Sequence, residues 1–298
     1  MSEVAELTGV IGHARARAQL QAELRCTGGA GSTLLCGPEG VGRFRLALAA
    51  ARAILGGTPA AARKVDKMLH PDLHLLLPET GIDGVRDVQV RLAHRAAEGP
   101  RPVLIARDAD RLSTEAQNAL LKTLEEPPAD AALFLVAQSP AFLPETVVSR
   151  CRLITLDSLS QADTRRVLEQ EGAPPEAAEH AEGSPGRALY RLHAGVPEAA
   201  DQLLQRMQDR ERDPLGGLDT LLKKRTEESG AEHRRRLTET LHVVGERLRS
   251  ELPETESGLR TVLKGLGSLR RNGNPSVVFA DVLLQSWRNR EKKAPSKR

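Results

Sequence analysis

The sequence predicts an α/β domain built on a parallel sheet, followed by a part that is helical throughout. Two apolar runs of strand length, residues 103–106 and 133–137, are joined through an amphipathic helix over residues 114–126. Continuous apolar strands linked by a helix are typical of a parallel sheet that is buried on both faces. From Pro197 onward the apolar residues recur at helical spacing, which predicts a small helical bundle. The 298 residues are enough for two or three domains.

The other elements of the α/β part follow from shorter patterns along the chain. A helical pattern is expected within residues 7–25, after Gly12, and a helix over residues 85–97. A short strand is expected over residues 33–36, and residues 70–76 are expected to lead into another strand. In the helix over residues 114–126, Thr114 and Gln117 have the spacing of a capping box. A short helix beginning at Pro144 is expected to carry residues 149–151, and a closing strand to cover residues 153–156. Three short helices are expected to begin after Ser160, at Pro174 and near Gly183.

The helical part is expected to bury one apolar face of each of its helices. Breaks between these helices are predicted near residues 213–214, 229–230, 252–253 and 273–275. Residues expected in its core are Leu221, Leu222, Leu237, Leu241, Val244, Leu248, Leu259, Val262, Leu263, Val277, Val278, Leu283 and Leu284.

Charge and composition exclude some classes of protein. The 43 basic and 40 acidic residues leave a net charge of +3, so no global basic field forces a nucleic-acid interpretation. The three cysteines, Cys26, Cys36 and Cys151, form no Cys-x-x-Cys pair, which excludes a cysteine zinc site and favours a reducing compartment. No apolar stretch approaches membrane-spanning length, and the first residues do not form a signal peptide. We therefore expect a cytoplasmic protein.

The turn after the first strand occupies the position of a phosphate-binding loop. Such a loop reads Gly-x-x-x-x-Gly-Lys-Ser/Thr: its backbone N–H groups surround phosphate, its lysine reaches the β- and γ-phosphates, and its hydroxyl holds Mg²⁺. Gly37, Gly40 and Gly42 could still form the cradle here. Arg43 replaces the lysine and Phe44 replaces the hydroxyl residue, and a phenyl ring cannot ligate a metal. We expect a degenerate loop that is nucleotide-free, a strand-to-helix turn inherited from a nucleotide-binding ancestor.

Residues 118–128, Asn-Ala-Leu-Leu-Lys-Thr-Leu-Glu-Glu-Pro-Pro, are followed by Ser-Arg-Cys at 149–151. Both motifs resemble the bacterial DNA polymerase III clamp loader, a pentamer of AAA+ subunits. The resemblance implies an AAA+ P-loop domain with a five-stranded parallel sheet over residues 1–157, a small helical lid over 158–196 and an all-α collar domain over 197–290. A basic tail over residues 291–298 would follow.

The same resemblance places Arg107 where an active subunit has its Mg²⁺-binding aspartate, and Asp108 where it has the glutamate that orients water. With Arg43 and Phe44, three positions have lost hydrolysis chemistry, so the pattern points to the non-hydrolysing delta-prime type. The small zinc module of that type is missing, since residues 56–69 contain no cysteine. We expect no zinc, and the module is either absent or replaced by a short helix. We expect structural roles for His70 and His74.

Arg150 is the residue to which the resemblance assigns a catalytic role. In the family this arginine projects in trans into a neighbour's ATP site, where a guanidinium stabilises the transferring phosphoryl group. The alternative is a solvated arginine that complements a helix C-terminus. Gln138 stands at a sensor position but is expected to have no role without phosphate nearby. Gly186 stands where an active lid has its arginine, and Arg187 lies one residue further on, so no lid sensor is expected.

The implied function is assembly rather than catalysis. ATP would be bound by the gamma/tau partner subunits, with delta as a further partner, and the complex would open a sliding clamp and place it on primer–template DNA. Contact with the clamp would be indirect, and no membrane is expected. Lys122 could contact DNA, although a lysine on an exposed helix face is more often solvated. Two alternatives are an active gamma/tau-type ATPase that uses Arg43, and an unrelated P-loop nucleotide kinase, which would explain neither motif.

Overall fold

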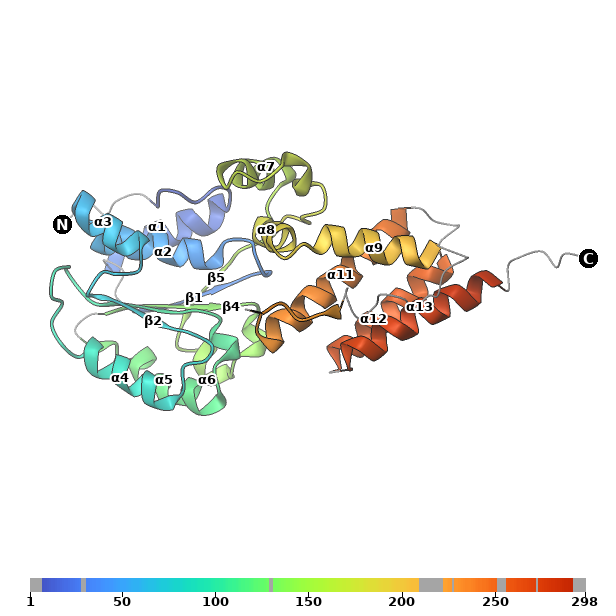
Figure 1. Ribbon diagram of the computed structural model, residues 1–298. Coiled ribbons are helices and arrows are strands. Elements are labelled where there is room, and N and C mark those ends of the chain that lie inside the picture. The colour runs from blue at the N-terminus through green and yellow to red at the C-terminus, as the bar shows by residue number, and fades with distance from the viewer. Residues whose placement is uncertain are drawn as a thin grey trace, which may run out of the picture. The chain divides into compact units, whose positions relative to one another are not determined.

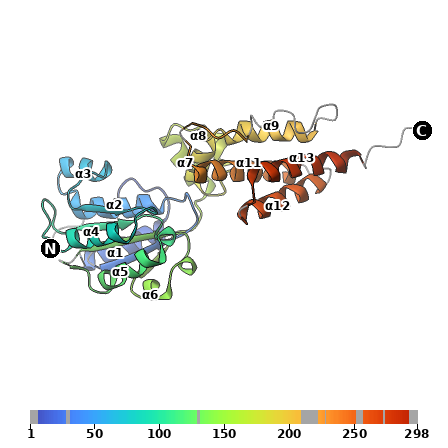
Figure 2. The ribbon, with the colours of Figure 1, turned by 60° about the horizontal axis from the view of Figure 1, so that its bottom comes forward.

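The computed structural model describes residues 7–27, 31–128, 131–208, 222–226, 228–250, 256–271 and 273–291. The chain divides into two compact units, Met1–Ala188 and Leu189–Arg298. The first is an α/β unit and the second is helical in its described residues (Figures 1 and 2). The boundaries expected at residues 157 and 196 for a lid and a collar stay predictions.

The α/β unit is organised around one parallel sheet of five strands in the order β2-β3-β4-β1-β5. The strands are β1 (Gly31–Cys36), β2 (Leu73–Leu76), β3 (Val103–Ala106), β4 (Ala132–Ala137) and β5 (Arg152–Thr155). Cys36 at the carboxyl end of β1 pairs with Ala137 of β4 and with Thr155 of β5. The five-stranded parallel sheet expected from the sequence is confirmed.

Helices cover both faces of the sheet (Figure 1). One side carries α1 (Ala14–Thr27) and α2 (Arg43–Leu55), with α3 (Pro59–Asp66) packed on α2; the other carries α4 (Ile82–Leu92), α5 (Thr114–Glu125) and α6 (Glu145–Val148). Phe134 belongs to the core on the α2 side, whereas its neighbours Leu133 and Leu135 belong to the core on the α5 side. This alternation is the two-residue period of a strand that is buried on both faces.

Several element ends differ from the expectation. Helix α4 stops at Leu92 rather than at residue 97, and α6 has only four residues, so Ser149 caps it and Arg150 follows it in a turn. The segment after Pro174 is a single 3-10 turn, η4 (Pro175–Ala178). The sequence predicted these helices to be longer than they are. Helical propensity is a weak guide to where a helix ends, because tertiary context can override it.

The capping box over Thr114 and Gln117 was also wrong. Ser113 is the N-cap of α5, and its Oγ accepts a hydrogen bond from the N–H of Ala116 at 3.2 Å. Gln117 is buried and donates from Nε2 to the carbonyls of Ala109 and Leu112, at 3.0 and 3.2 Å. These bonds hold the 3-10 turn η1 (Ala109–Arg111) against the start of α5, directly after β3.

After β5 in the chain, α7 (Gln161–Gln170) starts at the expected N-cap, Ser160, whose Oγ accepts from the N–H of Asp163. Helix α8 (Pro185–His193) begins in the α/β unit and ends in the helical unit. The short helix expected within residues 56–69 is confirmed as α3.

The helical unit contains α9 (Val196–Gln208), α11 (Gly230–Ser250), α12 (Glu256–Arg270) and α13 (Pro275–Glu291). Leu284 is half-buried. Several predictions lie outside the described residues: Leu221, the breaks near residues 213–214 and 252–253, and residues 292–298 of the tail. Leu263 and Val277 are exceptions to the predicted core, with 48% and 66% of their surface exposed. No helix in the described ranges is both long and apolar enough to cross a bilayer. The predicted core residues that are buried are Leu222, Leu237, Leu241, Val244, Leu248, Leu259, Val262, Val278 and Leu283.

Candidate functional site

The phosphate-loop turn connects β1 to α2 at the carboxyl edge of the sheet. Gly40 and Gly42 have φ of +78° and +108°, values that residues with a Cβ rarely adopt. Gly42 is the N-cap of α2, and its carbonyl accepts from the N–H of Leu46 at 3.0 Å. The backbone therefore keeps the strand–turn–helix form of a phosphate loop, with the helix N-terminus behind it.

Arg43 points inward from the start of α2. Its side chain is 6% exposed, and Nη2 lies 3.9 Å from Oδ1 of Asp108. Arg107 approaches the same carboxylate from the other side, with Nε 3.7 Å from Oδ2 of Asp108. Asp108 adopts φ of +48° directly after β3. Two guanidinium groups thus share one carboxylate just after β3.

Phe44 completes this arrangement. The guanidinium carbon of Arg107 lies 5.1 Å from the centroid of the Phe44 ring, within the range of a cation–π contact. A magnesium–nucleotide complex needs oxygen ligands and a phosphate-facing ammonium here, and this pair supplies a ring and a second cation. The described residues also contain no cluster of three or more His, Cys, Asp or Glu side chains that could hold a metal. The donor set does not fit Mg²⁺.

Asp110 ties the loop to the neighbouring strand. Its Oδ2 accepts from the N–H of Gln138 at 2.9 Å, and the carbonyl of Gln138 accepts from the N–H of Gly37 at 3.2 Å. Gln138 therefore holds the loop through its backbone. Burial raises the pKa of the nearby Cys36 thiol to about 11, although the charge of Arg43 opposes this shift. The thiol is neutral at physiological pH and acts as a small apolar group.

The start of α8 covers the outside of the loop. Ser184 donates from Oγ to the carbonyl of Glu39 at 2.7 Å, and the N–H of Gly186 donates to the carbonyl of Gly40 at 2.9 Å. A Cβ on Gly40 would lie 2.3 Å from Oγ of Ser184. Arg187 pairs with Glu182, with Nη1 3.1 Å from Oε2.

Residues that the sequence did not single out also fix the loop. His13 adopts φ of +51°, and its Nε2 lies 2.9 Å from the carbonyl of Val41. Neither His13 nor Ser184 belongs to a motif, and each reaches the loop from an element distant in the chain. The sequence held no signal for His13, because its positive φ is visible only in the folded chain.

Arg150 lies at the opposite edge of the sheet from the phosphate loop. It precedes β5, whose Arg152 pairs with Thr33, whereas the loop follows Cys36 at the other end of β1. Its Nε donates to Oε2 of Glu125 at 3.1 Å, and its Nη1 donates to the carbonyl of Thr146 at 3.1 Å. The side chain is 34% exposed, so the guanidinium is oriented by two acceptors and still open to solvent.

The remaining predicted residues lie apart from both places. Lys122 is exposed on α5. His70 is buried and accepts from the N–H of Asp72 at its Nδ1, 3.2 Å away. Burial, helped by the charge of Arg91, lowers the pKa of His74.

Comparison with known proteins gives consistent matches. A family model described as "DNA polymerase III, delta subunit" matches residues 12–160. The chain is 38% identical over 146 residues to DNA polymerase III subunit delta' of Escherichia coli (strain K12), covering 46% of this chain and 44% of that protein. It is 33% identical over 205 residues to the subunit delta' of Pseudomonas aeruginosa, covering 64% of this chain and 61% of that protein.

The matched stretches therefore span about half the length of these curated relatives. Among solved structures, a DNA polymerase III gamma subunit-related protein from Thermotoga maritima resembles this chain with a TM-score of 0.57. That alignment covers 91% of this chain and 99% of the other at 17% sequence identity, which is a likeness of fold.

Proposed function

The chain belongs to the DNA polymerase III delta-prime subunit family of AAA+ proteins, and from this premise we propose that it is a non-hydrolysing subunit of the clamp loader. In this role it helps the complex to place a sliding clamp on primer–template DNA in the cytoplasm. The observation that carries the proposal is the ion-pair arrangement in which Arg43 and Arg107 share Asp108 beside the Phe44 ring.

This arrangement opposes ATP hydrolysis on two physical grounds. A divalent cation that bound Asp108 would have to displace two guanidinium groups from its carboxylate. The position of the metal-binding hydroxyl is occupied by Phe44, which offers no oxygen. Phosphoryl transfer depends on metal-assisted charge neutralisation, so the loop of this subunit does not catalyse it.

Arg150 is the residue through which the subunit contributes to hydrolysis. It acts as an arginine finger in the ATP site of a neighbouring gamma/tau subunit, and the other partners are delta, the DNA and, indirectly, the clamp. Its place at the edge opposite the loop supports action in trans, because it is remote from the chain's own P-loop. Its two acceptors, Glu125 and the carbonyl of Thr146, hold the guanidinium ready without covering it.

The test is the DNA-stimulated ATPase of the assembled clamp loader. Arg150→Ala should leave assembly intact and lower turnover at the one neighbouring site by about 10³-fold, the lower end of finger effects. Arg152→Ala is the matched control, since Arg152 lies two residues away and is 57% exposed. An unchanged rate for the complex that contains Arg150→Ala would exclude the finger.

One observation favours a second candidate function, a gamma/tau-type ATPase with a variant loop. Nη1 of Arg43 is buried and has no hydrogen-bond partner among the described residues, so a phosphate oxygen could satisfy it. Calorimetry with ATP and ADP, with and without Mg²⁺, separates the two functions. The non-hydrolysing subunit should show no Mg²⁺-dependent affinity, whereas such affinity would favour the ATPase.

A further inference from the structure

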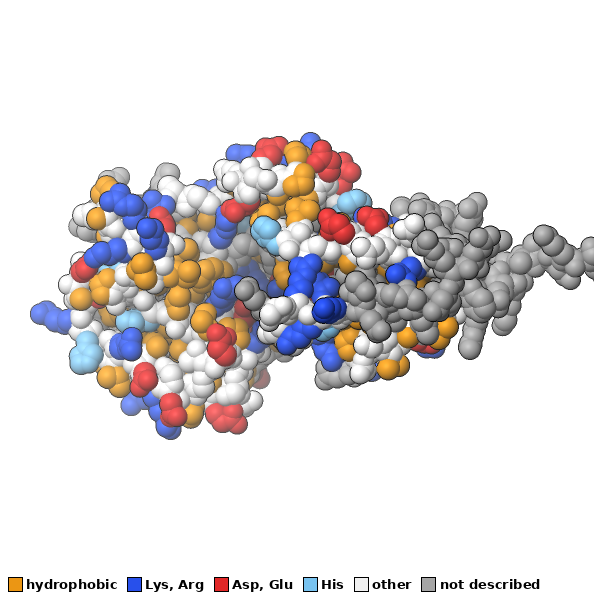
Figure 3. All heavy atoms as spheres, viewed as in Figure 1, with side chains coloured by type: hydrophobic (Ala, Val, Ile, Leu, Met, Phe, Trp, Pro, Cys, Tyr) orange, Lys and Arg blue, Asp and Glu red, His pale blue; other side chains and the backbone are white. Residues whose placement is uncertain are grey.

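The helical unit carries a short basic segment that the proposed function does not use. Lys223, Lys224 and Arg225 follow one another before α11 in a segment without regular secondary structure, and all three are exposed. Arg235, on the second turn of α11, is also exposed and lies over the ring of Tyr190, with 3.9 Å between the guanidinium carbon and the ring centroid. Figure 3 shows basic side chains gathered over this part of the unit.

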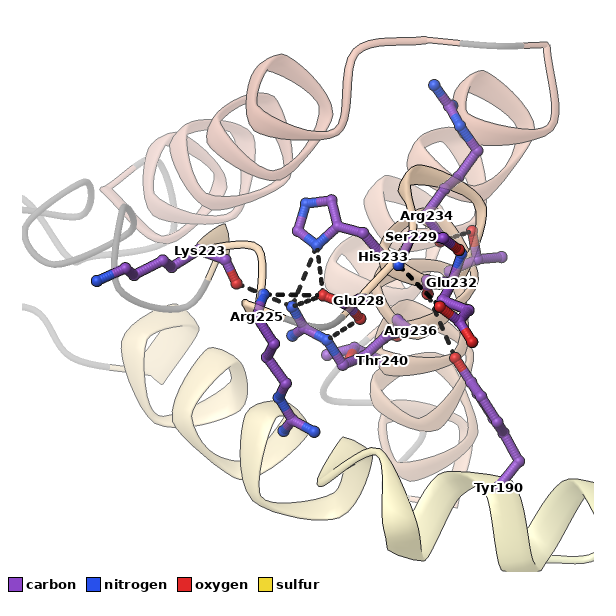
Figure 4. Close-up of polar contacts among 11 residues, drawn as sticks. Tyr190, Lys223, Arg225, Glu228, Ser229, Glu232, His233, Arg234, Arg236 and Thr240 are labelled. Carbon is purple, nitrogen blue, oxygen red and sulfur yellow. Dashed lines mark hydrogen bonds and ion pairs between the residues drawn. The ribbon is translucent and has the colours of Figure 1, made fainter.

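A buried ion pair lies directly behind the segment (Figure 4). Arg236 and Glu228 are 5% and 10% exposed, and Nε of Arg236 lies 2.9 Å from Oε1 of Glu228. Nη2 of Arg236 donates to Oε2 of Glu228 at 3.2 Å, and Nδ1 of His233 lies 3.2 Å from the same oxygen. Removing two charges from water costs free energy, and replacing a buried ion pair by apolar residues is therefore often neutral for the stability of a fold. The net stability of the pair does not by itself explain why it is there.

The pair does fix the backbone of the basic segment at both ends. Nη2 of Arg236 donates to the carbonyl of Lys223 at 3.0 Å, and the N–H of Arg225 donates to Oε2 of Glu228 at 3.2 Å. Each bond has one ionised partner, which makes it stronger than a bond between neutral groups. The buried pair thereby holds three consecutive cations in one conformation, and less entropy is lost when they bind an anion.

The segment forms one wall of a pocket of about 620 Å³, and the start of α9 forms the other. Glu198 and Gln202 come from α9, and Glu198 is the acidic residue among those that line the pocket. The apolar residues of the lining are Gly195 and Ala199, which are small. Partners held by protein–protein contacts usually bury an aromatic or a large aliphatic anchor among large apolar side chains, and no such side chain lines this pocket.

We propose that this basic pocket binds the sugar–phosphate backbone of a nucleic-acid strand. Lysine ammonium groups and an arginine fork are the side chains that neutralise phosphates, and the polar walls suit a ligand that is charged along its length. Contacts of this kind position a strand without reading its sequence. The site goes beyond the proposed function, because it lies in the helical unit and makes no use of Arg150 or of the phosphate loop.

The experiment measures binding of the purified full-length chain to fluorescein-labelled single-stranded and duplex DNA of one sequence. Fluorescence anisotropy is followed over a salt series from about 50 to about 200 mM, the range over which phosphate contacts weaken strongly. Lys223→Gln combined with Lys224→Gln should weaken binding roughly tenfold at the lowest salt and reduce the salt slope by about 2. Circular dichroism checks that the variant keeps its fold.

The matched control is Lys264→Gln combined with Arg271→Gln, which removes two exposed charges from α12 and the residue after it. It should bind DNA nearly as well as the natural chain. Lys223→Arg with Lys224→Arg keeps the charge and should restore binding. Equal losses in the Gln variant and the control would overturn the site, as would tighter binding to a labelled polyglutamate peptide than to either DNA. Neither outcome would bear on the finger, whose readout is the ATPase of the complex.

Discussion

Arg43 shows how far residue-level inference reaches. The spacing of the loop motif is fixed, so the loss of its lysine and hydroxyl follows directly from the sequence at positions 43 and 44. The pairing of Arg43 and Arg107 with Asp108 does not, because it depends on the left-handed conformation of Asp108, with φ of +48°, and on the packing of Phe44. A sequence pattern specifies which group is present, whereas the direction of its side chain is a tertiary property.

Glu125 gives the first residue-scale prediction. Its carboxylate accepts from Nε of Arg150 at 3.1 Å, so it acts as a positioning residue for the proposed finger. Glu125→Gln should lower kcat at the neighbouring ATP site several-fold and leave its KM unchanged, because the aligned guanidinium matters in the transition state. The pair is exposed, so the free energy of unfolding should change by less than about 1 kcal/mol.

The neighbouring Glu126 provides the control for this prediction. Glu126 is also exposed, and no described contact links its side chain to Arg150, so Glu126→Gln should leave kcat at the natural value. Glu125→Asp keeps the charge and should recover part of the rate. Equal kcat values for the two Gln variants would show that Arg150 is oriented without Glu125.

At the scale of elements, the sequence predicts existence and order better than ends. The central strands β3 and β4 lie where apolar runs predict them, since a strand buried on both faces must be apolar throughout. The edge strand β5 is exposed at three of its four residues, so its apolar pattern is weaker. The residues predicted to extend α4 are held by tertiary bonds instead. Asp72 accepts from the N–H groups of Ala97, Glu98 and Gly99 at 2.6, 2.9 and 2.7 Å, which holds residues 97–99 outside any helix.

The contact between α8 and the phosphate loop gives a prediction at this scale. Gly40 combines φ of +78° with a site where a Cβ would meet Oγ of Ser184 at 2.3 Å and the N–H nitrogen of Arg187 at 2.7 Å. Gly42 has φ of +108° with open space around the same position. Gly40→Ala should therefore reduce the free energy of unfolding by about 2 kcal/mol more than Gly42→Ala, because it adds a steric clash to the backbone strain.

Chemical denaturation of both variants, followed by circular dichroism, measures this difference. Gly42→Ala isolates the strain that comes from the backbone conformation alone. If the two substitutions are equally destabilising, the start of α8 does not contact Gly40 of the loop closely in solution.

At the scale of the molecule, the chain places different chemistry in two compact units. The fold class and the motifs of the α/β unit follow from the sequence because they rest on local patterns. The basic pocket of the helical unit does not follow from the sequence. Arg236 is separated from the segment that it holds by a break between helices. In addition, a run of cations in a sequence is usually a solvated face. The buried pair is visible in the folded chain alone.

Glu228 gives the prediction for this unit. Burial by itself would raise the pKa of its carboxyl, but hydrogen bonds from Arg236 and from the N–H of Arg225 outweigh burial and lower the pKa to about 2. A carboxyl whose pKa is lower in the folded state than its usual 4.5 stabilises the fold above pH 4.5. That stabilisation, about 3 kcal/mol, is lost as the pH falls from about 4.5 to about 2.

Glu228→Gln should therefore be less stable than the natural chain by about 3 kcal/mol near neutral pH, because Arg236 stays buried without its counter-charge. The difference should narrow steadily below pH 4.5 and become small near pH 2, where about half of the natural carboxyl is protonated. Urea unfolding curves of both proteins at a series of pH values give this difference directly, and acid effects that the two proteins share cancel. A difference that stays constant with pH would mean that Glu228 is not held as a carboxylate by Arg236, and the conformation of the basic segment would then need another cause.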